Sequence, residues 1–250
     1  MVSVEPVPDE PAAVAEGDGD RALVVADYHA GIERAIAVEH GVEIDSRADR
    51  RRERLLSLLD RTDPDRVVFL GDLMHSIGDP GGAERGEIEV LFEHLPAVPV
   101  TLVKGNHDGG IEDWVDGVDV TDSRGVCLGD VGFVHGHTWP APAVIETEVV
   151  CVGHEHPCVR LTDEVGGSRI ERVWLRGPLH REPFDQRPGA DDLDWRDPDA
   201  IVFPAFNELA GGTWVNLPDQ SFLAPFFPEA LDGADAYLLD GTRLGDYRTV

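Results

Sequence analysis

Short hydrophobic runs alternate with amphipathic stretches in the first half of the chain. Four or five consecutive apolar residues between polar ones predict a buried strand. Such runs lie at 22–26, 66–70 and 99–103. Helical spacing of apolar residues predicts helices at 31–42, 46–61 and about 84–95. Strands that alternate with helices are typical of an open α/β sheet.

From about residue 118 the pattern changes to short apolar runs separated by glycine and aspartate. This pattern favours an antiparallel or mixed second sheet. The predicted strands are 118–122, 125–130, 131–136, 149–154, 158–163, 169–175, 201–206 and 236–241.

Two polar segments lie outside this pattern. Residues 1–20 are acidic and rich in proline, and we expect them to form a flexible tail. Residues 181–200 are polar and contain prolines, which predicts a surface excursion from a single domain that spans 21–250.

Polar clusters follow each of the three early strands. Asp27-Tyr28-His29, Gly71-Asp72 and Gly105-Asn106-His107-Asp108 each begin where a hydrophobic run stops. Ligands collect at the carboxyl ends of strands in open α/β sheets. Two more clusters follow, HGH at 135–137 and GHEH at 153–156. Five such motifs in one order are far more specific than any one of them.

The donors in these motifs are carboxylate oxygen, amide oxygen and imidazole nitrogen. This set has no thiolate, so it favours Mn²⁺, Fe, Zn²⁺, Ni²⁺ or Co²⁺ over a soft metal. The two ends of a D-x-H motif can bind one cation, as can His154 and His156. An aspartate between two cations can bridge them at the roughly 3.5–4 Å separation used in two-metal phosphoryl chemistry.

The order D-x-H, G-D-x-x-H, G-N-H-D, H-G-H, G-H-x-H resembles that of the calcineurin-like metallophosphoesterases. The resemblance implies a four-layer α/β/β/α sandwich of two mixed sheets with two divalent metals, most simply Mn²⁺. It implies one metal on Asp27, His29 and His156 and the other on Asn106, His135 and His154, bridged by Asp72. It also implies hydrolysis by metal-activated hydroxide.

Four further residues receive roles on the same basis. His107 would protonate or stabilise the leaving oxygen, and Asp108 would orient His107. His75, in GDLMH, would contact the phosphate region. His137 competes with His135 for the metal; we favour His135, because it follows the strand directly, and leave His137 as a substrate contact.

Further segments resemble the small archaeal SbcD-related phosphoesterases and their bacterial relatives associated with a DNA ligase and a helicase. These segments are LGDLMHSIG, VKGNHDGGIE, GHEHP and PAFNELAGGTWVN. The resemblance implies a role in DNA repair, with a ligase or helicase as partner. The chain is much shorter than a full SbcD-type nuclease, which argues against the processing of double-strand ends.

The net charge is -28, and Lys104 is the only lysine. Dispersed acidic residues favour a surface adapted to high salt, and thus a halophilic source. No apolar run reaches the roughly 18 residues of a membrane span, and the start lacks signal-peptide features. We therefore expect a cytoplasmic protein that does not interact with membranes. The three cysteines form no CxxC pair and suit buried core positions.

For two segments the sequence is compatible with two interpretations. Arg34 and the arginines of 50–54 are either a solvated helix face or contacts to nucleic-acid phosphates. The glycine-rich loop 204–212 either approaches the site or makes ordinary turns.

The sequence predicts a metal-dependent phosphodiesterase that acts on nucleic acid or nucleotides. A small-molecule phosphatase or cyclic-nucleotide phosphodiesterase on the same scaffold is one alternative, because fold does not fix substrate. A metal-binding scaffold subunit without activity is another.

Overall fold

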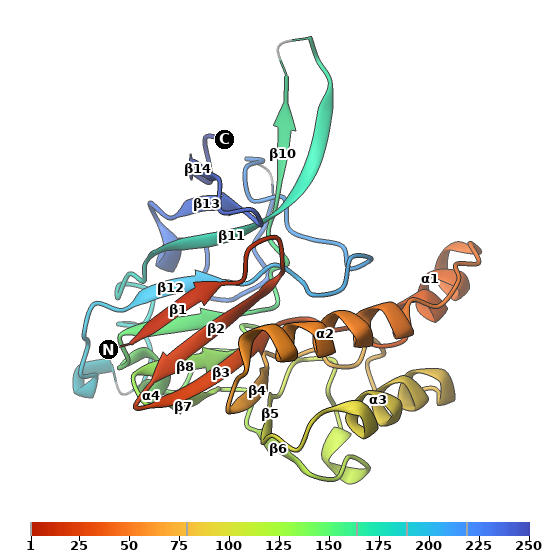
Figure 1. Ribbon diagram of the computed structural model, residues 1–250. Helices are drawn as coiled ribbons and strands as arrows, with labels where there is room; N and C mark the ends of the chain where they lie inside the picture. Colours follow the sequence, from red (N-terminus) through yellow and green to blue (C-terminus); the bar gives the residue numbers. More distant parts are fainter. Residues whose placement is uncertain (1, 79, 164, 189, 219) are drawn as a thin grey trace.

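The hydrophobic runs of the first half of the chain form adjacent parallel strands in a six-stranded sheet (Figure 1). The computed structural model describes residues 2–78, 80–163, 165–188, 190–218 and 220–250. The strand order is β1-β2-β3-β4-β5-β6, with β1 and β2 antiparallel to their neighbours. The strands are β1 (Ser3–Pro6), β2 (Ala12–Gly17), β3 (Asp20–Val25), β4 (Arg66–Phe69), β5 (Val100–Val103) and β6 (Val118–Thr121).

The second sheet has eight strands, seven of them in the order β14-β13-β11-β12-β9-β8-β7, and β10 pairs with β11. Strands β8, β9 and β12 are parallel, and the other pairs are antiparallel. The β10–β11 hairpin projects from the body of the molecule (Figure 1). The strands are β7 (Val126–Leu128), β8 (Val131–Val134), β9 (Val149–Val152), β10 (Cys158–Thr162), β11 (Ser168–Pro178), β12 (Asp199–Val202), β13 (Asp235–Leu238) and β14 (Arg243–Asp246).

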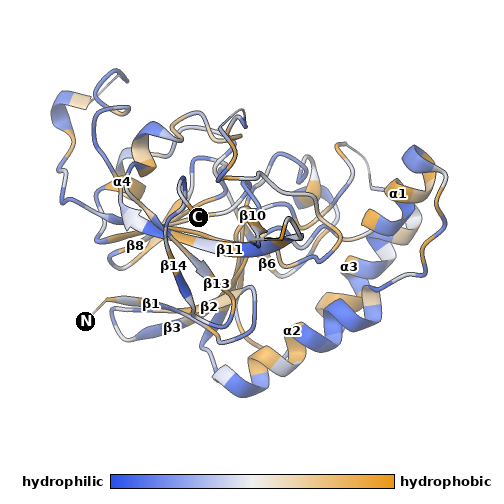
Figure 2. Cartoon of the chain, turned by 90° about the horizontal axis from the view of Figure 1, so that it is seen from above, coloured by the Kyte–Doolittle hydropathy of each residue, from blue (hydrophilic) through white to orange (hydrophobic). Residues whose placement is uncertain are grey.

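The predicted helices are present. Helices α2 and α3 pack on the outer face of the first sheet, and α1 lies further from the strands (Figure 1). Apolar residues recur along α2 between hydrophilic ones (Figure 2), and its buried side includes Leu55, Leu58 and Leu59. The outer face of the second sheet is covered by the short α4 and by loops that carry Phe184 and Phe226. The helical segments are α1 (Ile32–His40), α2 (Ala48–Thr62), α3 (Gly82–His94), α4 (Pro142–Ile145) and the 3-10 turns η1 (Ile111–Asp113), η2 (Ala190–Asp192) and η3 (Glu229–Leu231).

Alternation along the central strands explains why they are apolar throughout. In β3, Leu23 and Val25 pack against the helices, whereas Val24 packs against the second sheet. Phe133 and Cys151 face Val24 from the second sheet. Successive side chains of a strand point to opposite faces, so a strand with both faces covered is apolar at every position. The predicted class of two mixed sheets with helices outside is confirmed.

The prediction of a flexible tail at 1–20 is wrong. Its described residues form β1 and β2, and Ala12 and Ala13 are fully buried. Proline is compatible with this position, because β1 is an edge strand that leaves backbone groups unpaired. Met1 of this segment and Gly189 of the predicted excursion lie outside the described residues.

Two other assignments are corrected. The strand predicted at 118–122 belongs to the first sheet, where β6 lies parallel to β5 after the short η1 crossover. In 181–200 most of the described residues are exposed and without regular structure, but Phe184 is buried against Trp139 and Phe226. An aromatic anchor therefore fixes this segment to the domain.

The arginines of α2 have partners within the protein. Arg51 is buried and donates to Glu33 at 2.6 Å and to Glu87 at 2.7 Å. Arg50, in contrast, has an exposed side chain that pairs with Glu208 at 3.1 Å. Arg51 is thus a structural residue, and most of the cluster forms ion pairs with the protein's own carboxylates. In the part of the chain that the structure describes, no helix is long and apolar enough to span a bilayer.

We expect Arg51→Met to lower the free energy of unfolding by about 3–5 kcal/mol, because it leaves two buried carboxylates without a cation. Arg50→Met, the matched control on the same helix, should cost at most about 1 kcal/mol. Denaturant unfolding of both variants checks this. Equal effects would show that the buried triad contributes no more than a surface pair.

Candidate active site

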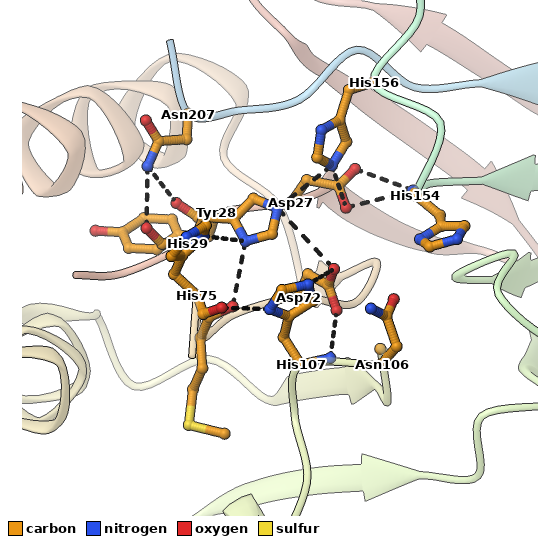
Figure 3. A network of polar contacts seen from close by, with 12 residues as sticks. Asp27, Tyr28, His29, Asp72, His75, Asn106, His107, His154, His156 and Asn207 are labelled. Carbon is orange, nitrogen blue, oxygen red and sulfur yellow. Dashed lines mark hydrogen bonds and ion pairs between the residues drawn. The ribbon is translucent and has the colours of Figure 1, made fainter. Parts of the chain in front are cut away.

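All five motifs meet at the edge where the parallel strands of both sheets end. Asp27 and Asp72 follow β3 and β4, and Asn106 follows β5. From the second sheet, His135 follows β8 and His154 follows β9. The site therefore lies between the two sheets, where Figure 3 shows the side chains converging.

The backbone at this edge is unusual. Positive φ angles occur at nine non-glycine residues of the described chain, and five of them belong to the motifs. Side chains other than glycine are disfavoured in this region, but Asp and His are among those that tolerate it. Such strain concentrates at functional sites, at roughly 1–3 kcal/mol per residue. The five residues are Asp27, His29, Asp72, His154 and His156.

Two motif glycines allow the loops to approach one another. A Cβ atom at Gly71 would collide with the ring of His135, and one at Gly105 would collide with Asp72. The first contact joins the two sheets, and the second joins two adjacent loops of the first sheet. Glycine is therefore required by packing at both positions.

The first donor group consists of Asp27, His29 and His156, whose ligand atoms lie within 4.8 Å of one another. Nδ1 of His29 contacts the Met74 carbonyl at 3.3 Å, and Nδ1 of His156 contacts the Gly211 carbonyl at 2.6 Å. A ring that donates its Nδ1–H to a carbonyl presents the lone pair of Nε2. The two Nε2 atoms face each other at 3.3 Å, beside Asp27.

The second donor group consists of Asp72, His135 and His154. Nδ1 of His135 contacts the Leu70 carbonyl at 2.9 Å, so this ring also presents Nε2. That atom lies 3.1 Å from Oδ1 of Asn106 and 3.3 Å from Oδ2 of Asp72.

Asp72 lies between the two groups. Its Oδ2 is 3.3 Å from Nε2 of His135 and 3.9 Å from Nε2 of His29. Burial disfavours its charge, but His135, His29 and His107 outweigh burial and hold the pKa of Asp72 well below its usual value. Burial and His135 lower the pKa of His154 to about 4, and burial and His156 lower that of His29 to about 3. Both rings are therefore neutral at neutral pH, as metal ligands must be.

These residues fit two cations. Opposed lone pairs at 3.3 Å repel unless a cation or a proton lies between them. The oxygens around Nε2 of His135 form a second cluster of acceptors, and Asp72 raises the pKa of His135 to about 9 in spite of burial. Histidines whose Nδ1–H is held by a carbonyl are typical metal ligands. Asp27, His29 and His156 would hold one ion, Asn106, His135 and His154 the other, and Asp72 would contact both.

His75 and His107 lie beside this centre. Their rings stack with centroids 5.7 Å apart, and Nε2 of His107 is 3.7 Å from Oδ2 of Asp72. Nδ1 of His75 is 3.4 Å from Nδ1 of His29. Two imidazoles are thus available next to the donor set.

Asp108 does not orient His107 as predicted. Its carboxylate is fully buried and accepts hydrogen bonds from the backbone N–H of Met74 at 3.1 Å and of Gly105 at 2.9 Å. The ring of His107 is instead oriented by the carbonyl of His75, which contacts its Nδ1. Burial and nearby Asp72 raise the pKa of Asp108 to about 6. Asp108 therefore joins the GDLMH and GNHD loops.

His137 lies further out in the same cluster. Its ring centroid is 5.3 Å from that of His135 and 6.0 Å from that of His154. Its Nδ1 atom is buried and has no hydrogen-bond partner among the described residues. His135, not His137, contacts Asp72 and Asn106.

Several supporting residues were missed from the sequence. Asn207 donates to the carbonyls of Tyr28 and His29 at 3.0 Å each. Glu84 accepts a hydrogen bond from the backbone N–H of His75 at 2.6 Å. The buried Glu155 accepts a hydrogen bond from the backbone N–H of Ala224, also at 2.6 Å. Glu155 lies within the GHEH motif, and Asn207 lies within the loop 204–212. Of the two interpretations of that loop, the structure supports approach to the site, because the Gly211 carbonyl contacts His156.

The fold and this set of nitrogen and oxygen donors define a metal-dependent phosphoesterase. A model of the calcineurin-like phosphoesterase family matches residues 21–158, more than half of the chain, and the chain therefore belongs to that family. No curated protein sequence matches it.

Two solved structures are similar to this chain. A nuclease MPE from Pseudomonas putida is 20% identical with a TM-score of 0.55, over 97% of this chain and 100% of that one. The phosphoesterase Yfce from E. coli is 22% identical, over 57% and 73% of the two chains, with a TM-score of 0.36. The first likeness shows the fold.

We expect Asp72→Asn to lower the occupancy of both metal sites together, because the amide removes the charge that the two sites share. Metal content per chain, measured by mass spectrometry after dialysis, checks this. Asp130→Asn is the matched control: it also follows a glycine, but its side chain pairs with Arg196 at the surface at 2.7 Å. Loss of one metal alone would refute a bridging position.

We expect Asp108→Asn to lower the free energy of unfolding by about 1–3 kcal/mol. Both carboxylate oxygens accept from backbone N–H groups, and the amide would place an NH₂ group, which is a donor, opposite one of them. Denaturant unfolding checks this, with the exposed Asp113→Asn as control. An unchanged stability together with a shifted pH profile of activity would restore the sequence-based role of orienting His107.

Proposed function

We propose that this phosphoesterase hydrolyses phosphodiester bonds of nucleic acid or nucleotides. The observation that carries the proposal is the position of His107. Its Nε2 lies 3.7 Å from Oδ2 of Asp72. His107 belongs to neither donor group that contains an aspartate, but its ring forms a set of nitrogen atoms with those of His29 and His75. Hydrolysis of a diester expels one of its alcohols as an alkoxide, which needs a proton. An imidazole beside the phosphate site can donate that proton.

The contacts of His107 define how it would act. Its Nδ1 donates to the His75 carbonyl, which fixes the ring and leaves Nε2 directed toward Asp72. A proton on Nε2 would be placed for transfer to a leaving oxygen. His75, stacked on the same ring, would contact the phosphate. Divalent cations bound at the donor groups would lower the pKa of the attacking water and neutralise phosphate charge.

A polymeric or nucleotide substrate suits the surroundings of the centre. A wide hollow of about 670 Å³ adjoins it, lined by Lys104, Asn106, Ser123 and His137 among others. The nuclease from Pseudomonas putida shares this fold over its whole length, which supports the same class of substrate here.

The finer assignments are proposals from the sequence. They are Mn²⁺ as the metal, an SbcD-related role in DNA repair with a ligase or helicase partner, a cytoplasmic location and a halophilic, archaeal source. The net charge of -28 supports adaptation to high salt.

The test is an assay of protein purified in high KCl, with bound metal determined first. With Mn²⁺, we expect turnover of diester and DNA substrates, and His107→Ala should lower it by about 10²-fold or more at unchanged metal content. His94→Ala is the matched control, because that exposed ring lies on α3 and its Nδ1 bonds to the Val90 carbonyl of the same helix.

Other substrates separate the alternatives. Turnover of monoesters alone would identify a phosphatase, and turnover of cyclic nucleotides alone a cyclic-nucleotide phosphodiesterase. Full metal occupancy without any turnover would identify a scaffold subunit. Single- and double-stranded DNA are compared in the same assay, since a nuclease should cleave at least one of them.

A further inference from the structure

A second pocket lies next to the HGH motif and plays no part in the metal centre. It has a volume of about 370 Å³, which is within the range of small-molecule sites. Trp139, two residues after His137, forms one wall. The pocket residues used below are Arg124, Trp139, Pro142, Phe184 and Arg187.

Trp139 is fixed as an aromatic platform. The Phe184 ring meets it edge-on at 5.7 Å, and the Phe226 ring lies 5.9 Å away. The guanidinium of Arg187 stands 4.7 Å from the ring centroid, on an exposed side chain. A flat ligand that stacks on this face would displace Arg187 without disturbing the packed side of the ring.

The arginines of the pocket differ from those of α2. Arg50 and Arg54 pair with Glu208 and Glu10. Within the described chain, Arg124 and Arg187 form no side-chain ion pair, although the protein is strongly acidic. An unpaired guanidinium suits a phosphate, which it can bind through two parallel hydrogen bonds.

The pocket and the metal centre share two loops. Ser123 and His137 line the hollow beside Asn106, and the neighbouring Arg124 and Trp139 line the pocket. The loops are joined by hydrogen bonds from Thr138 Oγ1 to the Ser123 carbonyl at 3.1 Å and from Ala141 N to the Arg124 carbonyl at 2.8 Å. The two hollows are thus lined by neighbouring residues of the same two loops.

We propose that this pocket binds the nucleobase of a nucleotide next to the scissile phosphate. Trp139 stacks on the base, and Arg124 and Arg187 bind a flanking phosphate. Stacking is open to every base, since each has a π-face, so the pocket recognises nucleotides without fixing the sequence. A base in the pocket is not paired, which favours single-stranded ends or free nucleotides. The inference rests on the proposed function and deepens it.

Two diesters with the same leaving group test the proposal, thymidine 5′-(4-nitrophenyl phosphate) and methyl 4-nitrophenyl phosphate. The quantity compared is the ratio of their kcat/KM values. Trp139→Ala should lower this ratio by about tenfold, as expected for one lost base stack, and Trp139→Phe should retain part of it. An unchanged ratio in folded Trp139→Ala would overturn the proposal.

A variant of surface residues guards against misfolding. The double variant Arg124→Gln, Arg187→Gln changes two exposed side chains. It should lower a second ratio, that of kcat/KM for the 3′-phosphorylated form of the thymidine ester, which carries a flanking phosphate, to kcat/KM for the unphosphorylated ester, and it should do so through KM. Arg85→Gln is the matched control, because Arg85 also lies over a tryptophan, 5.1 Å from the Trp114 ring, but outside the pocket. Equal ratios in the double variant and this control would count against a phosphate contact.

A binding measurement separates this inference from the proposed function. In excess chelator, without metal or turnover, a single-stranded trinucleotide containing 2-aminopurine should lose fluorescence on stacking with wild-type protein but not with Trp139→Ala. If Trp139-dependent quenching occurs but the metal-loaded protein hydrolyses neither ester, base binding in the pocket is supported and the proposed phosphodiesterase function is refuted. If the protein hydrolyses both esters but quenching does not depend on Trp139, the proposed function is supported and base binding in the pocket is refuted.

Discussion

The contact between the two sheets at the carboxyl ends of their parallel strands is the constraint on which the site depends. His135 reaches from the second sheet to the Leu70 carbonyl of the first at 2.9 Å, and its ring lies where a side chain on Gly71 would be. This contact brings the motifs of β8 and β9 against those of β3, β4 and β5.

The close approach also determines the electrostatics of the centre. Asp27 and Asp72 are almost completely buried among imidazoles. Burying a charge is costly unless it has a partner, and the pKa values of Asp72 and His135 move in opposite directions because each is the other's partner. Divalent cations would replace the shared protons. The left-handed backbone at Asp27 and Asp72 is retained because the surrounding hydrogen bonds hold it.

The sequence allowed the two-sheet class and the gathering of the motifs to be predicted, because few residue types provide hard ligands and parallel strands end at one edge. The first two strands were missed because small residues such as Ala12 and Ala13, beside prolines, look like a tail. The true partner of Asp108 was missed because its contacts are to backbone groups of Met74 and Gly105, which no motif records. Asn207 was missed for the same reason.

The charge distribution explains how so acidic a protein could accept an anionic substrate. The arginines of α2 look basic in the sequence, but they are neutralised by carboxylates such as Glu33, Glu87 and Glu208. Screening over roughly 10 Å at 0.1 M salt makes the distant acidic surface weak at the site. The positive groups that would act locally are the two cations, once bound, and Arg124 and Arg187, whose side chains form no ion pair among the described residues. In the proposed mode of binding, a phosphodiester would therefore lie between the metal groups and the pocket that contains Trp139.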